Sequence, residues 1–129
     1  MLTESDFAPL LEAVPSYAPQ WAQDREGVPP ESIPFELTMS LAWHLADRVA
    51  AGDETELGAF FGALDSLYRT GNHEMDDRLT VGLLESLIIA AEAREVNLGR
   101  ISAHITGAEA LAGWEASYAY IASKADDVP

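Results

Sequence analysis

The sequence predicts an all-α fold, a single-domain bundle or array of five or six helices, and three features lead to this prediction. Residues 79–91 are apolar on nearly every side and Glu85 is the only charge among them, which is typical of a helix buried inside a bundle. This pattern extends over residues 74–95 without a helix breaker, much further than a strand usually runs. Every proline except Pro129 lies before residue 35, and no segment alternates cleanly between apolar and polar residues.

Length and composition fit one folded domain. The chain has 129 residues, of which 48% are hydrophobic, so a chain of this size can bury about two-thirds of its unfolded surface around one core. We therefore expect one all-helical domain over residues 1–129. Within it, residues 1–33 should form short helices and a connector punctuated by prolines, and residues 34–125 should form the main helical core.

The N-terminal third is predicted to contain two short helices. The first begins near residues 5–6 and ends before Pro15, because the residue before a proline avoids helical geometry. Its apolar side chains at helical spacing are Phe7, Leu10, Leu11 and Val14. Ser16 is expected to cap a second helix that ends near Gly27, and an extended connector follows over residues 28–34.

Two longer helices are predicted next. One starts at residues 32–34 and ends at Gly52, and its apolar stripe consists of Leu37, Leu41, Leu45 and Val49. Asp53 begins a segment that resembles a helix start, with a Glu three residues later, so we expect it to cap the following helix. In that helix Gly58 and Gly62 are four residues apart, which would let a neighbouring helix approach closely.

The C-terminal half is predicted to hold the central helix and two more. Asn72 is expected to cap the central helix, and a turn after Val96 leads to a short helix over residues 101–105. The segment 106–109 has the capping-box pattern, with Thr106 and a Glu three residues later. The last helix is expected to pack one face inward, formed by Leu111, Trp114, Tyr118 and Ile121.

The chain is strongly acidic. Its formal charge is −15, from 22 acidic against 7 basic residues, so its surface should repel nucleic acid and anionic membranes, which are bound through Lys and Arg. A basic protein would be attracted, and the encounter would be faster. Solubility or adaptation to salt explains such acidity equally well, because net charge affects how a protein associates with others but does not indicate one particular function.

The sequence also indicates where the protein works. There is no cysteine, which favours a reducing cytoplasm. The first residues are acidic where a signal peptide would be basic, and no run approaches the roughly 20 apolar residues of a membrane span. We therefore expect a cytoplasmic protein.

Part of the chain resembles a known family. Residues 60–87 combine an aromatic-rich helix, a glycine turn with acidic residues, and an apolar helix that contains Leu-Glu-Ser-Leu at residues 84–87. Residues 106–114 add a helix with a late tryptophan. Between Phe60 and Trp114 the chain thus resembles a small bacterial all-helical family with similarity to the immunity proteins of polymorphic toxins. The resemblance implies a protein that binds and inhibits a toxin.

One surface is the leading candidate for contact with a partner. If the central helix is a regular α-helix, its acidic residues share a face on which apolar residues lie between the charges. The candidate partner-binding residues are Glu74, Asp77, Val81, Glu85, Ile88 and Glu92. The alternative is an ordinary solvated face, or a Glu85 that caps a loop or pairs with an arginine. Exposed apolar positions on this helix, like the Gly58/Gly62 face, would also be compatible with a homodimer.

Other kinds of site have weaker support. His73 and Asp77 are four residues apart and could begin a metal site, but acidic residues are favoured at a helix start in any case, and no Glu-x-x-His motif supplies further ligands. A ligand pocket between helices could be lined by six aromatic residues, although such residues at helical spacing usually form core: Trp21, Trp43, Trp114, Phe35, Phe60 and Phe61. No nucleophile, phosphate-binding or dinucleotide motif is present, so we expect neither enzyme activity nor a cofactor.

The prediction from sequence is therefore a cytoplasmic, all-helical domain that binds a basic protein, such as a bacterial toxin, as an immunity-type inhibitor. The alternatives are a small-molecule-binding or sensor domain with an aromatic pocket between helices, and a structural domain.

Overall fold

The computed structural model describes residues 1–126, and the predicted all-α class is confirmed. Among the described residues 79% of the structure is helical and there is no strand. The helices are α1 (Ala8–Ala13), α2 (Ala18–Asp24), α3 (Ile33–Ala50), α4 (Leu57–Thr70), α5 (His73–Asp77), α6 (Glu85–Ala93), α7 (Leu98–Ser102) and α8 (Ala108–Asp126). The predicted count of five or six is close but not exact, because the central helix changes its winding and is divided into segments. The end of the predicted domain, residues 127–129, lies outside the described part.

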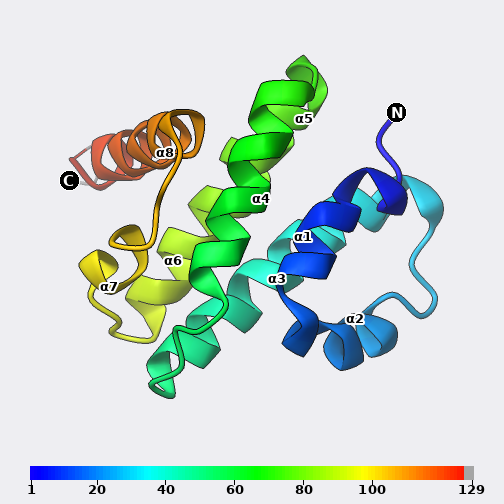
Figure 1. Cartoon of the computed structure of the whole chain (residues 1–129), viewed down its shortest axis with the longest axis horizontal. Helices are drawn as coiled ribbons and strands as arrows, with labels where there is room; N and C mark the ends of the chain where they lie inside the picture. Colours follow the sequence, from blue (N-terminus) through cyan, green and yellow to red (C-terminus); the bar gives the residue numbers. More distant parts are fainter. Residues whose placement is uncertain (127–129) are drawn as a thin grey trace.

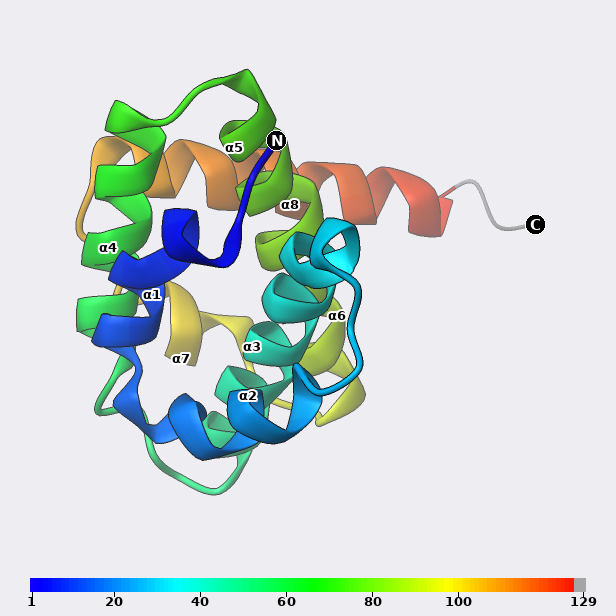
Figure 2. The same ribbon diagram turned by 90° about the vertical axis from the view of Figure 1, so that its right-hand side faces the viewer.

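Helices α3 and α6 pack against each other in the middle of the molecule, and the others surround them (Figure 1). Helix α1 lies against α4 and α2 lies against α3, on the N-terminal side. Helix α8 packs across α4 and α6 on the opposite side. In the view of Figure 2, the C-terminal half of α8 extends past the neighbouring helices. The two ends of the described chain are therefore on different sides of the core.

Helix α3 follows the apolar period of its sequence. The stripe predicted to face the core is buried, with Leu37 and Leu41 fully inaccessible to solvent. Pro34 occupies the first turn, where its missing N–H has no hydrogen-bond partner to lose. The helix ends at Ala50, and Gly52 follows with a φ of +90°, a left-handed conformation that favours glycine. Both predicted ends of this helix are confirmed to within a few residues.

The central helix is continuous but not uniformly α-helical. Its start at Asn72 is confirmed, because the Asn72 side chain accepts a hydrogen bond from the Met75 N–H at 3.0 Å. Between α5 and α6, residues Arg78–Leu84 form a π-helical segment, in which hydrogen bonds span one residue more than in an α-helix. Each π-turn therefore turns the residues that follow it relative to those that precede it. The assumption of one regular α-helical face along residues 74–92 was wrong.

Helix α8 buries only part of the face predicted for it: Trp114 is buried and Ile121 packs against the core, as expected. The inward residues are Ala110, Gly113, Trp114 and Ser117. Leu111 and Tyr118, which were expected to face the core, are 45% and 51% exposed. The Ser117 hydroxyl donates to the Thr80 carbonyl at 3.1 Å, so a polar and small-residue stripe makes the contact. Small residues allow α8 to approach its neighbours more closely than bulky ones would.

Three predicted helix starts differ from the structure because distant side chains take part. Ser16 lies within a 3₁₀ turn, Pro15–Tyr17, and bonds to residues of other helices instead of capping α2. Asp53 accepts hydrogen bonds from the N–H and hydroxyl of Thr55, an Asx turn that precedes α4 by several residues. At the start of α8, where a capping box beginning at Thr106 was predicted, the N–H groups of Glu109 and Ala110 donate instead to Asp65 of α4.

The close approach of two helices, which was predicted at Gly58 and Gly62, occurs at another glycine. A Cβ atom built on Gly58 or Gly62 would meet nothing within 4 Å, so no helix of the described chain packs closely there. On Gly113 of α8 it would lie 2.4 Å from the Tyr68 hydroxyl oxygen of α4. The glycine that the packing requires is therefore Gly113, and the prediction for the Gly58/Gly62 pair was wrong within this chain.

Candidate functional site

A groove of the described surface lies beside the predicted partner-binding residues. Its volume is about 520 Å³, and it lies between the N-terminal segment, the start of α3 and the π-helical segment. We call it the N-terminal groove, and its walls are formed by Met1, Leu2, Glu31, Pro34, Phe35, Glu74, Asp77, Arg78 and Val81. Three of the six predicted residues, Glu74, Asp77 and Val81, thus lie in one groove.

The N-terminal groove combines exposed apolar groups with acidic groups. Phe35 is 48% and Val81 58% exposed, although both are large hydrophobic residues. Glu31, Glu74 and Asp77 supply three carboxylates around them. Such a surface has apolar anchors that can supply affinity, and charges that can orient a basic partner.

Two cations of the chain already lie in the N-terminal groove: the N-terminal ammonium of Met1, 3.9 Å from Glu74 Oε2, and the side chain of Arg78. The guanidinium carbon of Arg78 is 5.9 Å from the centre of the Phe35 ring, within the range of a cation–π contact. A Cβ on Gly82 would lie 2.8 Å from Cδ of Arg78, so the Arg78 side chain runs back over this glycine. The same Cβ would be 3.0 Å from the hydroxyl oxygen of the fully buried Thr38. The π-helical segment and α3 therefore approach closely here, which fixes Phe35 relative to Val81.

The other half of the predicted surface lies elsewhere. Ile88 is fully buried, so its assignment to an exposed contact face was wrong, and its neighbour Ile89 is 51% exposed instead. The exposed apolar positions on this helix are Val81 and Ile89, eight residues apart over about two turns, as expected for a helix wound more loosely than 3.6 residues per turn. Glu92 is exposed near the end of α6 and does not line the N-terminal groove.

Glu85 has neither of the partners proposed for it. Within the described part of the chain it makes no ion pair and no side-chain hydrogen bond, so it caps no loop and pairs with no arginine. It is partly buried, and this desolvation raises the pKa of its carboxyl group.

Sequence reasoning missed several residues of the groove. Glu31 and Arg78 were not singled out, and Phe35 was considered only as part of an aromatic pocket. The signal for Phe35 was its place in the first turn of a helix that follows a proline-rich connector, where a large side chain can remain outside the core. No signal in the sequence joins residues 31–35 to residues 74–81, because the two segments meet only through the packing of α3 on the central helix.

The proposed start of a metal site has no further ligands. His73 Nε2 lies 3.4 Å from Asp77 Oδ2, and both side chains are largely exposed, at 91% and 67%. Among the described residues no group of three or more His, Asp or Glu side chains is arranged to hold a metal ion. The pair is a helix-surface contact between residues four apart.

The six aromatic residues considered for a pocket do not line one cavity. Phe60 and Phe61 are fully buried, and Phe61 packs edge-on against Trp114 at 6.2 Å between ring centres. Trp21 donates its indole N–H to Glu4 at 3.0 Å. Trp43 and Phe35 lie in separate surface grooves.

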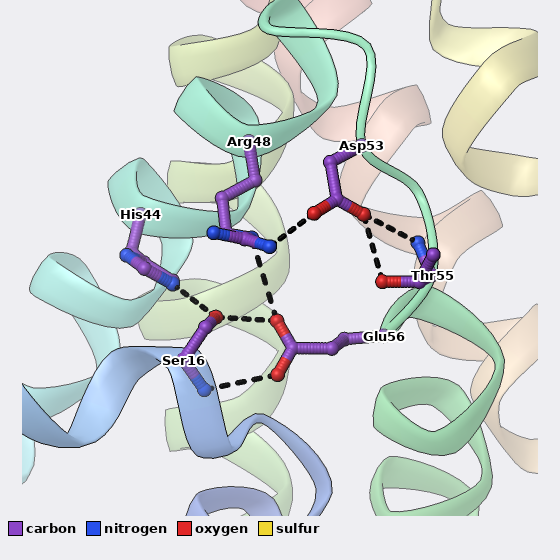
Figure 3. A network of polar contacts seen from close by, with 6 residues as sticks. All are labelled: Ser16, His44, Arg48, Asp53, Thr55 and Glu56. Carbon is purple, nitrogen blue, oxygen red and sulfur yellow. Dashed lines mark hydrogen bonds and ion pairs between the residues drawn. The ribbon is translucent and has the colours of Figure 1, made fainter.

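A polar network joins the N-terminal third to the turn between α3 and α4 (Figure 3). Glu56 accepts hydrogen bonds from both the N–H, at 3.0 Å, and the hydroxyl of Ser16. The Arg48 guanidinium pairs with Glu56 at 3.5 Å and with Asp53. His44 Nε2 lies 2.8 Å from the Ser16 hydroxyl oxygen. These contacts hold the start of α2 against α3 and α4.

The serine, histidine and glutamate of this network are not arranged as a catalytic triad. In a triad the histidine lies between the acid and the serine and accepts the serine proton. Here Glu56 binds Ser16 directly, so the serine hydroxyl donates to the carboxylate, and His44 Nε2 must be protonated to donate to the serine oxygen. Burial, and next the charge of Arg48, lower the pKa of His44. The arrangement stabilises the fold and does not activate Ser16.

Comparisons with known proteins point to one family. A family model described as "Domain of unknown function (DUF7674)" matches residues 7–107. No curated protein and no solved structure shows significant similarity to the chain. The match covers α1 to α7 and stops just before α8, so it includes most of the N-terminal groove. In the part of the chain that the structure describes, no helix is long and apolar enough to cross a membrane.

Proposed function

The chain belongs to the DUF7674 family of domains of unknown function, and we propose that it binds a basic protein through the N-terminal groove. The observation that carries the proposal is the pairing of two exposed hydrophobic side chains, Phe35 and Val81, with the carboxylates of Glu31, Glu74 and Asp77. Large apolar side chains that remain exposed beside charged groups are typical of contact surfaces.

Binding, and not catalysis, is the proposed activity. The strongest candidate for a nucleophile, Ser16, donates its proton to a carboxylate, and no other arrangement of acid, base and nucleophile was identified among the described residues. An immunity-type inhibitor works by such binding alone: it covers a toxin or blocks its active site. The net charge of −15 would speed its encounter with a basic partner. The absence of cysteine supports a cytoplasmic place of action.

The test is affinity capture from a lysate of the source organism, with partners identified by mass spectrometry at low and at high salt. The baits are the wild-type chain, a groove variant with Phe35→Ala and Asp77→Asn, and a control variant with Tyr120→Ala and Glu115→Gln. The control makes the same kinds of change at exposed residues of α8. We expect the wild type and the control to retain one basic protein at low salt, and the groove variant to lose it.

The purified partner then gives a quantitative measurement. Phe35→Ala should weaken the affinity by about tenfold if Phe35 anchors the contact. Affinity should also fall as salt increases, because the carboxylates of the groove are screened. Equal affinity for the groove variant and the control variant would refute this placement of the contact.

A further inference from the structure

A second groove, of about 330 Å³, lies between α2 and α3 and is separate from the N-terminal groove. We call it the α2–α3 groove. Asp24 of α2 forms one wall, and Glu36, Met39, Trp43, His44 and Asp47 of α3 form the other. Its side chains thus include an indole ring, a thioether and three carboxylates. An aromatic face beside carboxylates is the arrangement that attracts an organic cation.

The three carboxylates of the α2–α3 groove differ in the hydrogen bonds and ion pairs that they make with the rest of the chain. Asp24 accepts hydrogen bonds from Ser40 and Gln20, and Asp47 pairs with Arg94. Glu36 makes neither a hydrogen bond nor an ion pair through its side chain with any described residue. A carboxylate without a protein partner therefore lies at one end of the groove, a few turns of α3 away from the Asp47 end.

The Asp47 end already holds a guanidinium from this chain. The guanidinium carbon of Arg94 lies 5.0 Å from the centre of the Trp43 ring, and its Nε donates to Asp47 at 2.7 Å. Arg94 belongs to the end of α6, so it reaches the groove from outside. The planar guanidinium is thus held by an aromatic ring and a carboxylate together. Arginine is better suited than lysine to such a site, because its planar group can stack on a ring while it pairs with a carboxylate.

Both ends of α2 are fixed to α3, so the groove exists before anything binds. At the start, the Ser16 hydroxyl is held by His44 and Glu56, as Figure 3 shows. At the end, the Ser40 hydroxyl of α3 donates to Asp24. Between these contacts, the Tyr17 ring packs against His44 with 5.3 Å between ring centres. A groove with fixed walls loses little conformational entropy on binding.

We propose that the α2–α3 groove binds an arginine side chain of a protein partner, with the guanidinium at Glu36 and the aliphatic stem over Met39 and Trp43. Charge complementarity selects a cation, because three carboxylates line the groove and, among the described residues, only Asp47 is paired with a cation, Arg94. The chain's own use of Trp43 and Asp47 for Arg94 selects a guanidinium. This groove is distinct from the N-terminal groove, so the inference stands or fails independently of the function proposed above.

The test is an NMR titration of the full chain at low salt with the peptide acetyl-Gly-Arg-Gly-amide. Two further peptides replace arginine by citrulline, which has the same shape without the charge, or by lysine. We expect saturable shifts confined to the Trp43 indole N–H and to the amides of residues 20–24 and 36–47. The citrulline peptide should give none, and the lysine peptide should bind more weakly.

A matched pair of variants tests the role of Glu36. E36Q removes the carboxylate that has no partner, and E12Q makes the same change on the exposed surface of α1. E36Q should weaken binding of the arginine peptide roughly two- to fivefold, as expected for a partly exposed ion pair, and E12Q should leave it unchanged.

Three results would overturn the inference. Scattered, unsaturable shifts, or equal shifts with the lysine peptide, would show a general attraction of cations to an acidic surface. Equal effects of E36Q and E12Q would remove Glu36 from the site. Binding of free arginine without binding of the peptide would show a small-molecule site that a protein chain cannot enter.

Discussion

Asp65 connects the two halves of the domain through a single side chain. It lies on α4 and is 8% exposed, and its Oδ1 atom accepts hydrogen bonds from the N–H groups of Glu109 and Ala110, each at 3.0 Å. These are N–H groups of the first turn of α8, which have no partner within their own helix. A Cβ on Gly107 would lie 2.0 Å from Cγ of Asp65, so the residue before α8 must be glycine for this contact to form.

Replacing Asp65 should therefore cost stability. Asp65→Ala leaves two N–H groups of a buried helix end without an acceptor, and we expect a loss of about 1–3 kcal/mol in the free energy of unfolding. Urea denaturation measures it. Asp65→Asn keeps an acceptor oxygen and should lose less, and Asp77→Ala at an exposed position should change stability by less than about 0.5 kcal/mol. If Asp65→Ala cost no more than Asp77→Ala, the role of Asp65 in capping α8 would be disproved.

At the scale of residues, the sequence predicts a helix cap when the capping residue is next to its helix. It does not predict a cap that is supplied by a residue far away in the sequence. Asn72 caps the helix immediately after it, and this was predictable. Ser16 and Glu56 have the residue types of local caps, but they bond to each other across 40 positions of sequence. No pattern within one segment shows that the true acceptor for α8 lies on α4.

At the scale of elements, the winding of the central helix decides which of its residues line the N-terminal groove. Because residues 78–84 are π-helical, Val81 lies in the N-terminal groove while Ile88, at the predicted α-helical spacing, is buried. A sequence read with a period of 3.6 residues cannot detect this change, since apolar residues occur on every side of the segment. The predicted contact residues before and within the π-helical segment line the groove, and those after it do not.

The helices also differ in how closely they pack, and two glycines test this. Gly62→Ala in α4 should raise the free energy of unfolding by about 0.5–1 kcal/mol, because alanine favours helix and nothing obstructs its methyl group. Gly113→Ala in α8 should lower it by about 1–3 kcal/mol, because the methyl group would overlap the Tyr68 ring and hydroxyl. Thermal or urea unfolding of both variants measures the difference. Changes of the same sign would contradict the contact between α4 and α8.

At the scale of the whole molecule, the net charge of −15 opposes folding. Like charges are closer together in the folded chain than in the unfolded one, so their repulsion is a cost of compactness. The ion pairs between described residues are mostly exposed and offset little of it.

Salt should therefore stabilise the protein. Raising NaCl from about 0.05 M to about 0.5 M shortens the screening length several-fold and should increase the free energy of unfolding. Urea denaturation at both concentrations measures the change, and KCl in place of NaCl separates screening from binding of one particular ion. A decrease with salt would mean that local ion pairs, and not overall repulsion, dominate the electrostatic free energy.

The fold class was predictable from the sequence, but the way in which the helices pack against one another was not. The helical period of α3 and α4, the absence of proline between Pro34 and Pro129, and the glycine stops predict the long helices correctly. The contact of α8 through small residues, the attachment of the N-terminal third and the meeting of residues 31–35 with the central helix depend on pairs far apart in sequence. The candidate site was therefore predictable only on one of its walls.

The π-helical segment gives the central helix more residues than an α-helix of the same length would have. A shift from π to α winding there can compensate for the loss of one residue, so that helices α6 to α8 keep their orientation. Helix α3 has no π-helical turn, so the loss of one residue inside it would rotate every later residue of that helix by about 100° around its axis. Residues 78–84 are thus the part of the core where the chain can best accommodate a change in its own length.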